Sequence, residues 1–171
     1  MSPRKKTKNG GTAKKKSTPA KRKAPPKVFV SYSHRDEKYK NELVTMLAGL
    51  ENQKIIKVWQ DRRIEPGEEW YKAIRKAMKT CQVALLLVSQ YFLASAFIQN
   101  EELPTLLEQR INNGLIVIPI IIRPCLWNKN PILRNLQALP KDAKPIASVS
   151  SSSRRDQIWV DIAEAIERRV K

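Results

Sequence analysis

Three short runs of consecutive apolar residues limit the fold of this chain more than any other feature. They cover Val28–Val30, Val83–Val88 and Leu115–Ile122, and the stretches between them show apolar residues at helical spacing. A strand that is apolar at every position is buried on both faces, as in a parallel sheet covered by helices on each side. The pattern therefore predicts an α/β domain.

Shorter signals complete the expected order of elements. Lys54–Val58 and Ile146–Val149 predict two further strands, which gives five in all. Helices are expected over 36–50, from Glu68-Glu69 to about Thr80, over 92–112 with a bend or break at Pro104, and over 154–170. The flavodoxin-like doubly wound order suits such a chain, and its ligands bind beyond the carboxyl ends of the strands. The expected site therefore lies in the loops after Val30, Val58 and Val88.

The N-terminal segment has a different character from the rest of the chain. Eleven of the 33 basic residues and no acidic residue lie within residues 1–27, so the rest carries +6 of the net charge of +17. Residues 1–26 hold almost nothing to bury and are expected to form a disordered basic tail, followed by one domain over 27–171. The lysines could contact nucleic acid without sequence specificity, or an acidic membrane surface, but no aromatic residue is interleaved for base stacking.

The cellular setting follows from what the chain lacks. No apolar segment follows the basic N-terminus as in a signal peptide, and the apolar runs are too short for a membrane span. Cys81 and Cys125 adjoin apolar runs and make no disulfide framework, so both are expected to be core thiols. A reducing, cytoplasmic location is the expectation.

Several kinds of chemistry are excluded by composition. The five glycines fit neither a G-x-G-x-x-G loop nor a P-loop, and no G-x-S-x-G elbow occurs. One histidine and two distant cysteines cannot form a structural zinc site, so no metal is expected. A phosphoacceptor receiver domain would need clustered acidic residues after the first strand, where Asp36 stands alone.

Three segments at the expected ligand-facing edge remain to be explained. They are Val28–Asp36, with Ser31-Tyr32-Ser33-His34; Val58–Gly67, with Asp61, Ile64, Pro66 and Gly67 as D-x-x-I-x-P-G; and Leu87–Leu103, with Ser89, Phe97 and Glu101-Glu102. Together they resemble the opening strand, the BB loop and the fourth-strand serine with its following helix in Toll/interleukin-1 receptor (TIR) domains of bacterial type. The resemblance is strong over about 27–125 and looser beyond.

The resemblance implies one of two activities. Some TIR domains assemble through TIR–TIR contacts without turnover, and the Asp61–Gly67 loop would then form the interface. Others cleave NAD at the nicotinamide–ribose bond, releasing nicotinamide and linear or cyclic ADP-ribose. The resemblance implies NAD as a substrate rather than a cofactor, activation by self-association, and a separate sensor or adaptor protein.

In the enzymatic case, the resemblance places the essential glutamate at Glu101, counted from Phe97. Glu102 would then point about 100° away on the helix. Residue type and expected location suggest further ligand contacts at Tyr32, Ser33, His34, Trp59, Asp61, Arg62, Arg63, Ser89 and Phe97. Simpler roles stay open: a solvated carboxylate for Glu101, a loop hydrogen bond for His34 or Ser89, core packing for Trp59, and solvated charges for the two arginines.

Overall fold

The computed structural model describes residues 24–59 and 70–171. Its centre is a parallel sheet of β1 (Lys27–Ser31), β2 (Lys57–Trp59), β3 (Val83–Val88) and β4 (Ile116–Ile121), in the order β2-β1-β3-β4. Within the described ranges the sheet has these four strands rather than the five expected. Val28 aligns with both Val58 and Val83, and Val83 aligns with Ile116. The predicted doubly wound α/β class is confirmed.

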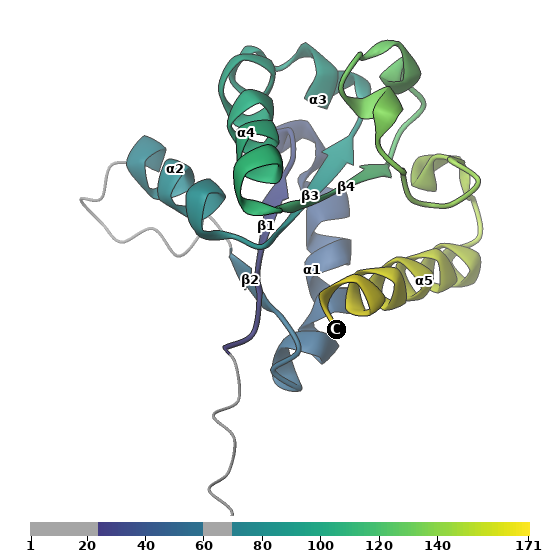
Figure 1. The fold of residues 1–171 in the computed structure, drawn as a ribbon. Coiled ribbons are helices and arrows are strands. Elements are labelled where there is room, and N and C mark those ends of the chain that lie inside the picture. The colour runs from purple at the N-terminus through teal and green to yellow at the C-terminus, as the bar shows by residue number, and fades with distance from the viewer. Residues whose placement is uncertain (1–23, 60–69) are drawn as a thin grey trace, which may run out of the picture.

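Helices cover both faces of this sheet (Figure 1). One face packs against α1 (Glu37–Asn52) and α5 (Ser152–Val170), and the other against α2 (Trp70–Thr80), α3 (Gln90–Ala94) and α4 (Leu103–Asn113). Alternate residues of β3 serve the two layers: Leu85 and Leu87 face the first, and Leu86 and Val88 the second. All six residues of β3 are fully buried, which explains why this strand contains no polar residue.

The expected strand over Ile146–Val149 is wrong. Ile146–Ser148 forms a 3-10 turn, with Ile146 buried in the α1/α5 layer. The place beside β4 is instead taken by Leu139, which exchanges two 2.8 Å backbone hydrogen bonds with Pro119 and Ile121. Pro140 follows directly and has no N–H to donate, so it cannot add another donor to this pairing.

The expected helix over 92–112 is divided into three parts. Ser89 caps α3 by accepting hydrogen bonds from the amides of Tyr91 and Phe92, and Ser95 ends this helix with extended backbone. A π-helical turn, Ile98–Glu102, then leads into α4. Pro104 lies in the first turn of α4, where its missing N–H has no helical partner to lose. The predicted break therefore occurs at Ser95, before the proline.

The proposed N-terminal tail lies outside the described residues, apart from its last three positions, and so does the expected start of a helix at Glu68-Glu69. No helix in the described ranges is long and apolar enough to span a membrane.

The packing of α5 gives a direct test of this architecture. Ile162 on α5 is 1% exposed within the layer shared with α1, and Ile111 on α4 is 82% exposed. Ile162→Ala should lower the free energy of unfolding by about 2–5 kcal/mol, because it removes buried methyl groups and leaves a cavity. The matched Ile111→Ala should change it by less than about 0.5 kcal/mol. Urea unfolding measures both, and equal losses would contradict the packing described.

Candidate functional site

A cavity of about 480 Å³ lies at the carboxyl ends of β1 and β2. Its described lining residues come from β1, the turn after it, α1, β2, α2 and the segment around the π-helical turn. They are Phe29, Val30, Tyr32, Ser33, His34, Arg35, Lys40, Val44, Trp59, Ile74, Ser95, Phe97, Ile98 and Glu102. This is the edge at which parallel α/β sheets bind ligands, so the cavity is the candidate site.

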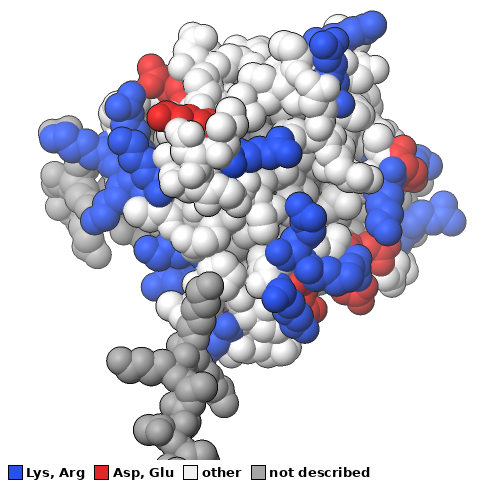
Figure 2. Space-filling view, viewed as in Figure 1, with Lys and Arg blue, Asp and Glu red and all other residues white. Residues whose placement is uncertain are grey.

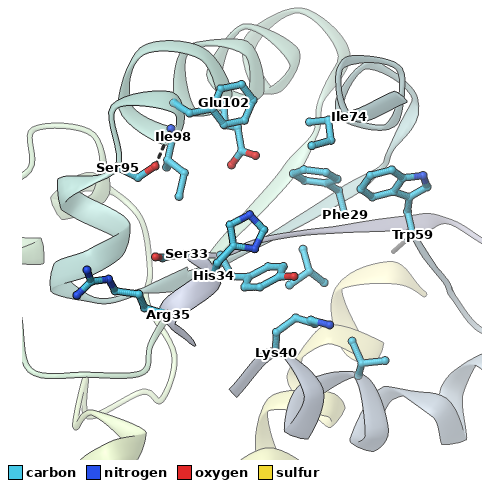
Figure 3. Close-up of a pocket in the computed structure, with 14 residues that line it drawn as sticks. Phe29, Ser33, His34, Arg35, Lys40, Trp59, Ile74, Ser95, Ile98 and Glu102 are labelled. Atoms are coloured by element: carbon cyan, nitrogen blue, oxygen red, sulfur yellow. Dashed lines mark hydrogen bonds between the residues drawn. The ribbon is translucent and has the colours of Figure 1, made fainter. Parts of the chain in front are cut away.

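One side of the cavity is apolar and aromatic. Phe29 and Trp59 stack at a tilt with ring centroids 5.5 Å apart, and Ile74 of α2 lies beside them in Figure 3. Phe97 also lines the cavity, with its ring edge-on to Tyr71 at 5.9 Å. Such a surface can contact a planar ring without competing for its hydrogen bonds. The expected placement of Trp59 and Phe97 at the site therefore agrees with the geometry.

The carboxylate that enters the cavity is Glu102 (Figure 3). Glu102 is 6% exposed, and its Oε2 accepts a hydrogen bond from the hydroxyl of Ser31 at the end of β1. Burial raises the pKa of Glu102 to about 6, and the Ser31 hydrogen bond opposes part of that rise. A buried carboxyl that titrates near neutral pH in a cavity is a recognised mark of a functional site.

Glu101 lies outside the cavity, which corrects the expected placement of this residue. Its side chain is 41% exposed, and its Oε2 accepts hydrogen bonds from the Tyr71 hydroxyl at 2.8 Å and from Arg75 at 3.1 Å. These two bonds lower the pKa of Glu101. Glu101 thus joins the π-helical turn to α2 on the surface.

The π-helical turn accounts for the different directions of these two neighbouring glutamates. The amide of Leu103 bonds to the carbonyl of Ile98, five residues back instead of four. One extra residue is thereby inserted into the turn, so side chains after it are rotated relative to an α-helix. A sequence signal for Glu102 did exist, because it lies four residues from both Ile98 and Leu106, which are buried at 3% and 0% exposure.

The opposite side of the cavity is cationic. Tyr32, Ser33, His34 and Arg35 follow β1 in the turn that leads to α1, and Lys40 comes from α1 itself. The rings of Tyr32 and His34 meet edge-on at 5.9 Å, and Figure 3 places His34 between Glu102 and Lys40. Among the described lining residues, Lys40 is thus the cation that lies across the cavity from Glu102, whereas the guanidinium of Arg35 lies over the ring of Tyr91 at 5.1 Å.

Ser89 does not line this cavity, contrary to its expected ligand contact. It is fully buried, and its hydroxyl donates to Asp36 Oδ2 while capping α3. Asp36 Oδ1 also pairs with Nε of Arg123 at 2.7 Å. Asp36 thus ties the turn after β1 to the residues that follow β3 and β4. Sequence reasoning assigned no role to Asp36, Arg123 or Lys40.

The remaining expected contacts, Asp61, Arg62 and Arg63, lie outside the described residues.

The two cysteines are partly buried and carry free thiols, and burial raises the pKa of Cys81 to about 11. In residues 24–59 and 70–171, no group of three or more His, Cys, Asp or Glu side chains is arranged to hold a metal ion.

A second groove of about 600 Å³ lies between α4, β4 and α5. Its described lining includes Arg110, Lys141, Arg168 and Arg169 but no carboxylate. Figure 2 shows Lys and Arg side chains spread across this side of the molecule, with Asp and Glu among them. The groove offers positive charge without an acid or a nucleophile, so the cavity at the strand ends is the better candidate for chemistry.

The fold and cavity define a parallel α/β domain whose ligand-binding edge holds a cavity with a single carboxylate, Glu102, among its described lining residues. The family model of the TIR domain matches residues 28–158. The chain therefore belongs to the TIR-domain family, as the three sequence segments suggested.

The chain is similar to known proteins in both sequence and structure. The chain is 40% identical over 140 residues to y4lF, an uncharacterized protein of Sinorhizobium fredii, and this match covers 82% of the chain. The chain spans 40% of the length of that relative. Among solved structures, the TIR domains of the activated Roq1 resistosome align with 20% identity and a TM-score of 0.49, covering 81% of this chain and 84% of that one.

The raised pKa of Glu102 predicts how stability depends on pH. Between pH 4.5 and about 6 the folded chain holds more protons at Glu102 than the unfolded chain. The contribution of this residue to the free energy of unfolding therefore falls as pH rises through that window. The full difference is about 2 kcal/mol. Glu102→Gln removes it, so the variant should gain about 2 kcal/mol relative to the wild type from well below pH 4.5 to well above pH 6.

Urea unfolding at several pH values measures this gain. Glu101→Gln is the matched control, because its carboxylate is exposed and the variant should show no comparable gain. Stability curves of wild type and Glu102→Gln that run parallel from pH 4.5 to 7 would contradict the assignment.

Proposed function

We propose that this TIR domain is a signalling enzyme that hydrolyses NAD at the nicotinamide–ribose bond, with Glu102 as the catalytic carboxylate. The observation that carries the proposal is a buried glutamate aimed into an aromatic-walled cavity at the carboxyl edge of the sheet. Membership of the TIR family supports the reaction class, since the sequence resemblance implies NAD cleavage for part of that family.

One carboxylate is enough for this chemistry. Glycoside hydrolysis ordinarily needs an acid to protonate the leaving oxygen. Nicotinamide leaves from a positively charged pyridinium and departs neutral, so no proton donor is required. What the protein must supply is negative charge beside the ribose as the oxocarbenium-like transition state develops, and a preorganised carboxylate in a low-dielectric cavity does this.

The surroundings of Glu102 suit that task. The Ser31 hydroxyl holds one carboxylate oxygen in place, which keeps the other available to the ribose. Burial makes the carboxyl group of Glu102 costly to ionise when no substrate is bound. A cationic substrate would offset that cost by pairing with the carboxylate. Trp59, Phe29 and Phe97 would contact the nicotinamide ring, and Tyr32, Ser33 and His34 lie where the rest of the substrate would pass.

Self-association is part of the proposal and is supported by membership of the family, and recruitment by a separate sensor or adaptor is proposed with it. The assay below therefore includes protein clustered on vesicles or beads as well as protein in solution. Contact of the basic N-terminal segment with nucleic acid and a cytoplasmic location stay predictions from the sequence, as does the choice between a linear and a cyclic product.

The first test is nicotinamide release from NAD by purified, clustered protein. Glu102→Gln should lower kcat/KM by about 100-fold or more, because it removes charge that stabilises the transition state. Glu101→Gln should lower it by less than about twofold, because it breaks only an exposed ion pair and hydrogen bond. No release by the wild type, or equal loss in the two variants, would remove the proposal.

The pH profile gives an independent check. The reaction needs the ionised carboxylate, so kcat/KM should rise with pH through a pKa near that of Glu102 in the free enzyme, about 6, and then level off. Initial rates of nicotinamide release at constant ionic strength measure the profile. A rate that falls as pH rises through this range would mean that the protonated form acts, contrary to the proposed role.

A further inference from the structure

The cavity contains a buried lysine that the reaction described above does not use. Lys40 on α1 is 4% exposed, although lysine is among the residues least often buried. Its side chain lines the cavity on the side opposite Glu102 (Figure 3). Removing an ammonium from water costs several kcal/mol unless partners replace the lost hydration.

The partners that the protein supplies are weak. Nζ lies 3.7 Å from Oε1 of Glu37, whose side chain is 49% exposed, and 5.4 Å from the centre of the Tyr32 ring. Neither contact is a hydrogen bond, and Lys40 makes no other interaction with the described part of the chain. An ammonium has three donors, so Lys40 retains the capacity to bind a ligand oxygen.

The cavity carries opposite charges on its two sides. Glu102 and Lys40 lie across the cavity from each other, and Phe29 and Trp59 lie along one flank between them (Figure 3). A ligand that matches both sides carries a planar or cationic group at one end and an anion at the other. Phosphate is the anion that lysine commonly binds in proteins.

We propose that Lys40 forms a phosphate subsite that binds the diphosphate of the dinucleotide. The inference deepens the proposed function and rests on it for the identity of the ligand, because the observation itself requires only a phosphate-bearing ligand. Glu102 and Lys40 would then contact different parts of the same ligand, the ribose and the diphosphate. The subsite lets the cavity discriminate dinucleotides from nucleosides that carry the same rings without phosphate.

Equilibrium binding tests the subsite without turnover. Calorimetry would measure the dissociation constants of ADP-ribose, inorganic pyrophosphate and adenosine for the full chain. Lys40→Met keeps the length and apolar stem of the side chain, and it should weaken ADP-ribose and pyrophosphate by about tenfold or more, the value of one charge-assisted hydrogen bond. Adenosine should change by less than about twofold, since it carries no anion.

The control is Lys38→Met, which removes an equal charge from an exposed position on the same helix and should leave all three affinities within about twofold. Thermal melting confirms that each variant is folded, and Lys40→Arg, which keeps the charge, should retain phosphate binding if Lys40→Met unfolds. Unchanged ADP-ribose binding in Lys40→Met, an equal loss for adenosine, or no ADP-ribose binding by the wild type would overturn the subsite.

The result also separates the two proposals. Lys40-dependent binding of ADP-ribose without nicotinamide release would keep the subsite and remove the enzymatic function. Nicotinamide release together with Lys40-independent binding would do the reverse.

Discussion

Burial of the central sheet on both faces is the constraint from which the site follows. Every residue of β3 is shielded from water, so layers of helices must cover both sides of the sheet. Helical crossovers make neighbouring strands parallel and bring their carboxyl ends to one edge. The polar residues after β1 and β3 therefore lie at that edge, as the hydrogen bond from Ser89 to Asp36 shows. The loops there can carry polar side chains, whereas the buried strands cannot.

At that edge, one local departure from regular helix geometry determines which of two neighbouring glutamates faces the cavity. The five-residue hydrogen bond from Leu103 to Ile98 rotates the following side chains, so Glu102 turns inward to Ser31 and Glu101 turns outward to Tyr71 and Arg75. π-Helical turns carry a cost in backbone geometry and occur often at functional sites. Two adjacent glutamates thus differ in burial, in the direction of their pKa and in what they can do.

The cavity is polar along its length rather than uniformly apolar. A buried acid, Glu102, lies across the cavity from a buried lysine, Lys40, and aromatic rings lie along its flank. Each charge is expensive to bury alone, and residues 24–59 and 70–171 give each only modest compensation: one hydroxyl for Glu102, and a distant carboxylate and a ring for Lys40. A ligand with complementary charges would supply the rest, which is why both proposals draw on the same observation.

The sequence by itself determined the fold class, the edge of the sheet that carries the site, and most of its aromatic and loop residues, because burial periodicity and strand ends are local properties. Tyr32, Ser33, His34, Trp59 and Phe97 were expected at the cavity and line it. Only the tertiary structure showed that Glu102 and not Glu101 enters the cavity, because a π-helical turn shifts side chains without changing composition. The structure also showed an isolated bridge at Leu139 in place of the expected fifth strand. It showed that the Ser89 hydroxyl donates a hydrogen bond to Asp36 rather than lining the cavity. The burial of Lys40, to which the sequence assigned no role, was likewise decided by the packing of α1, because burial depends on contacts between segments distant in the chain.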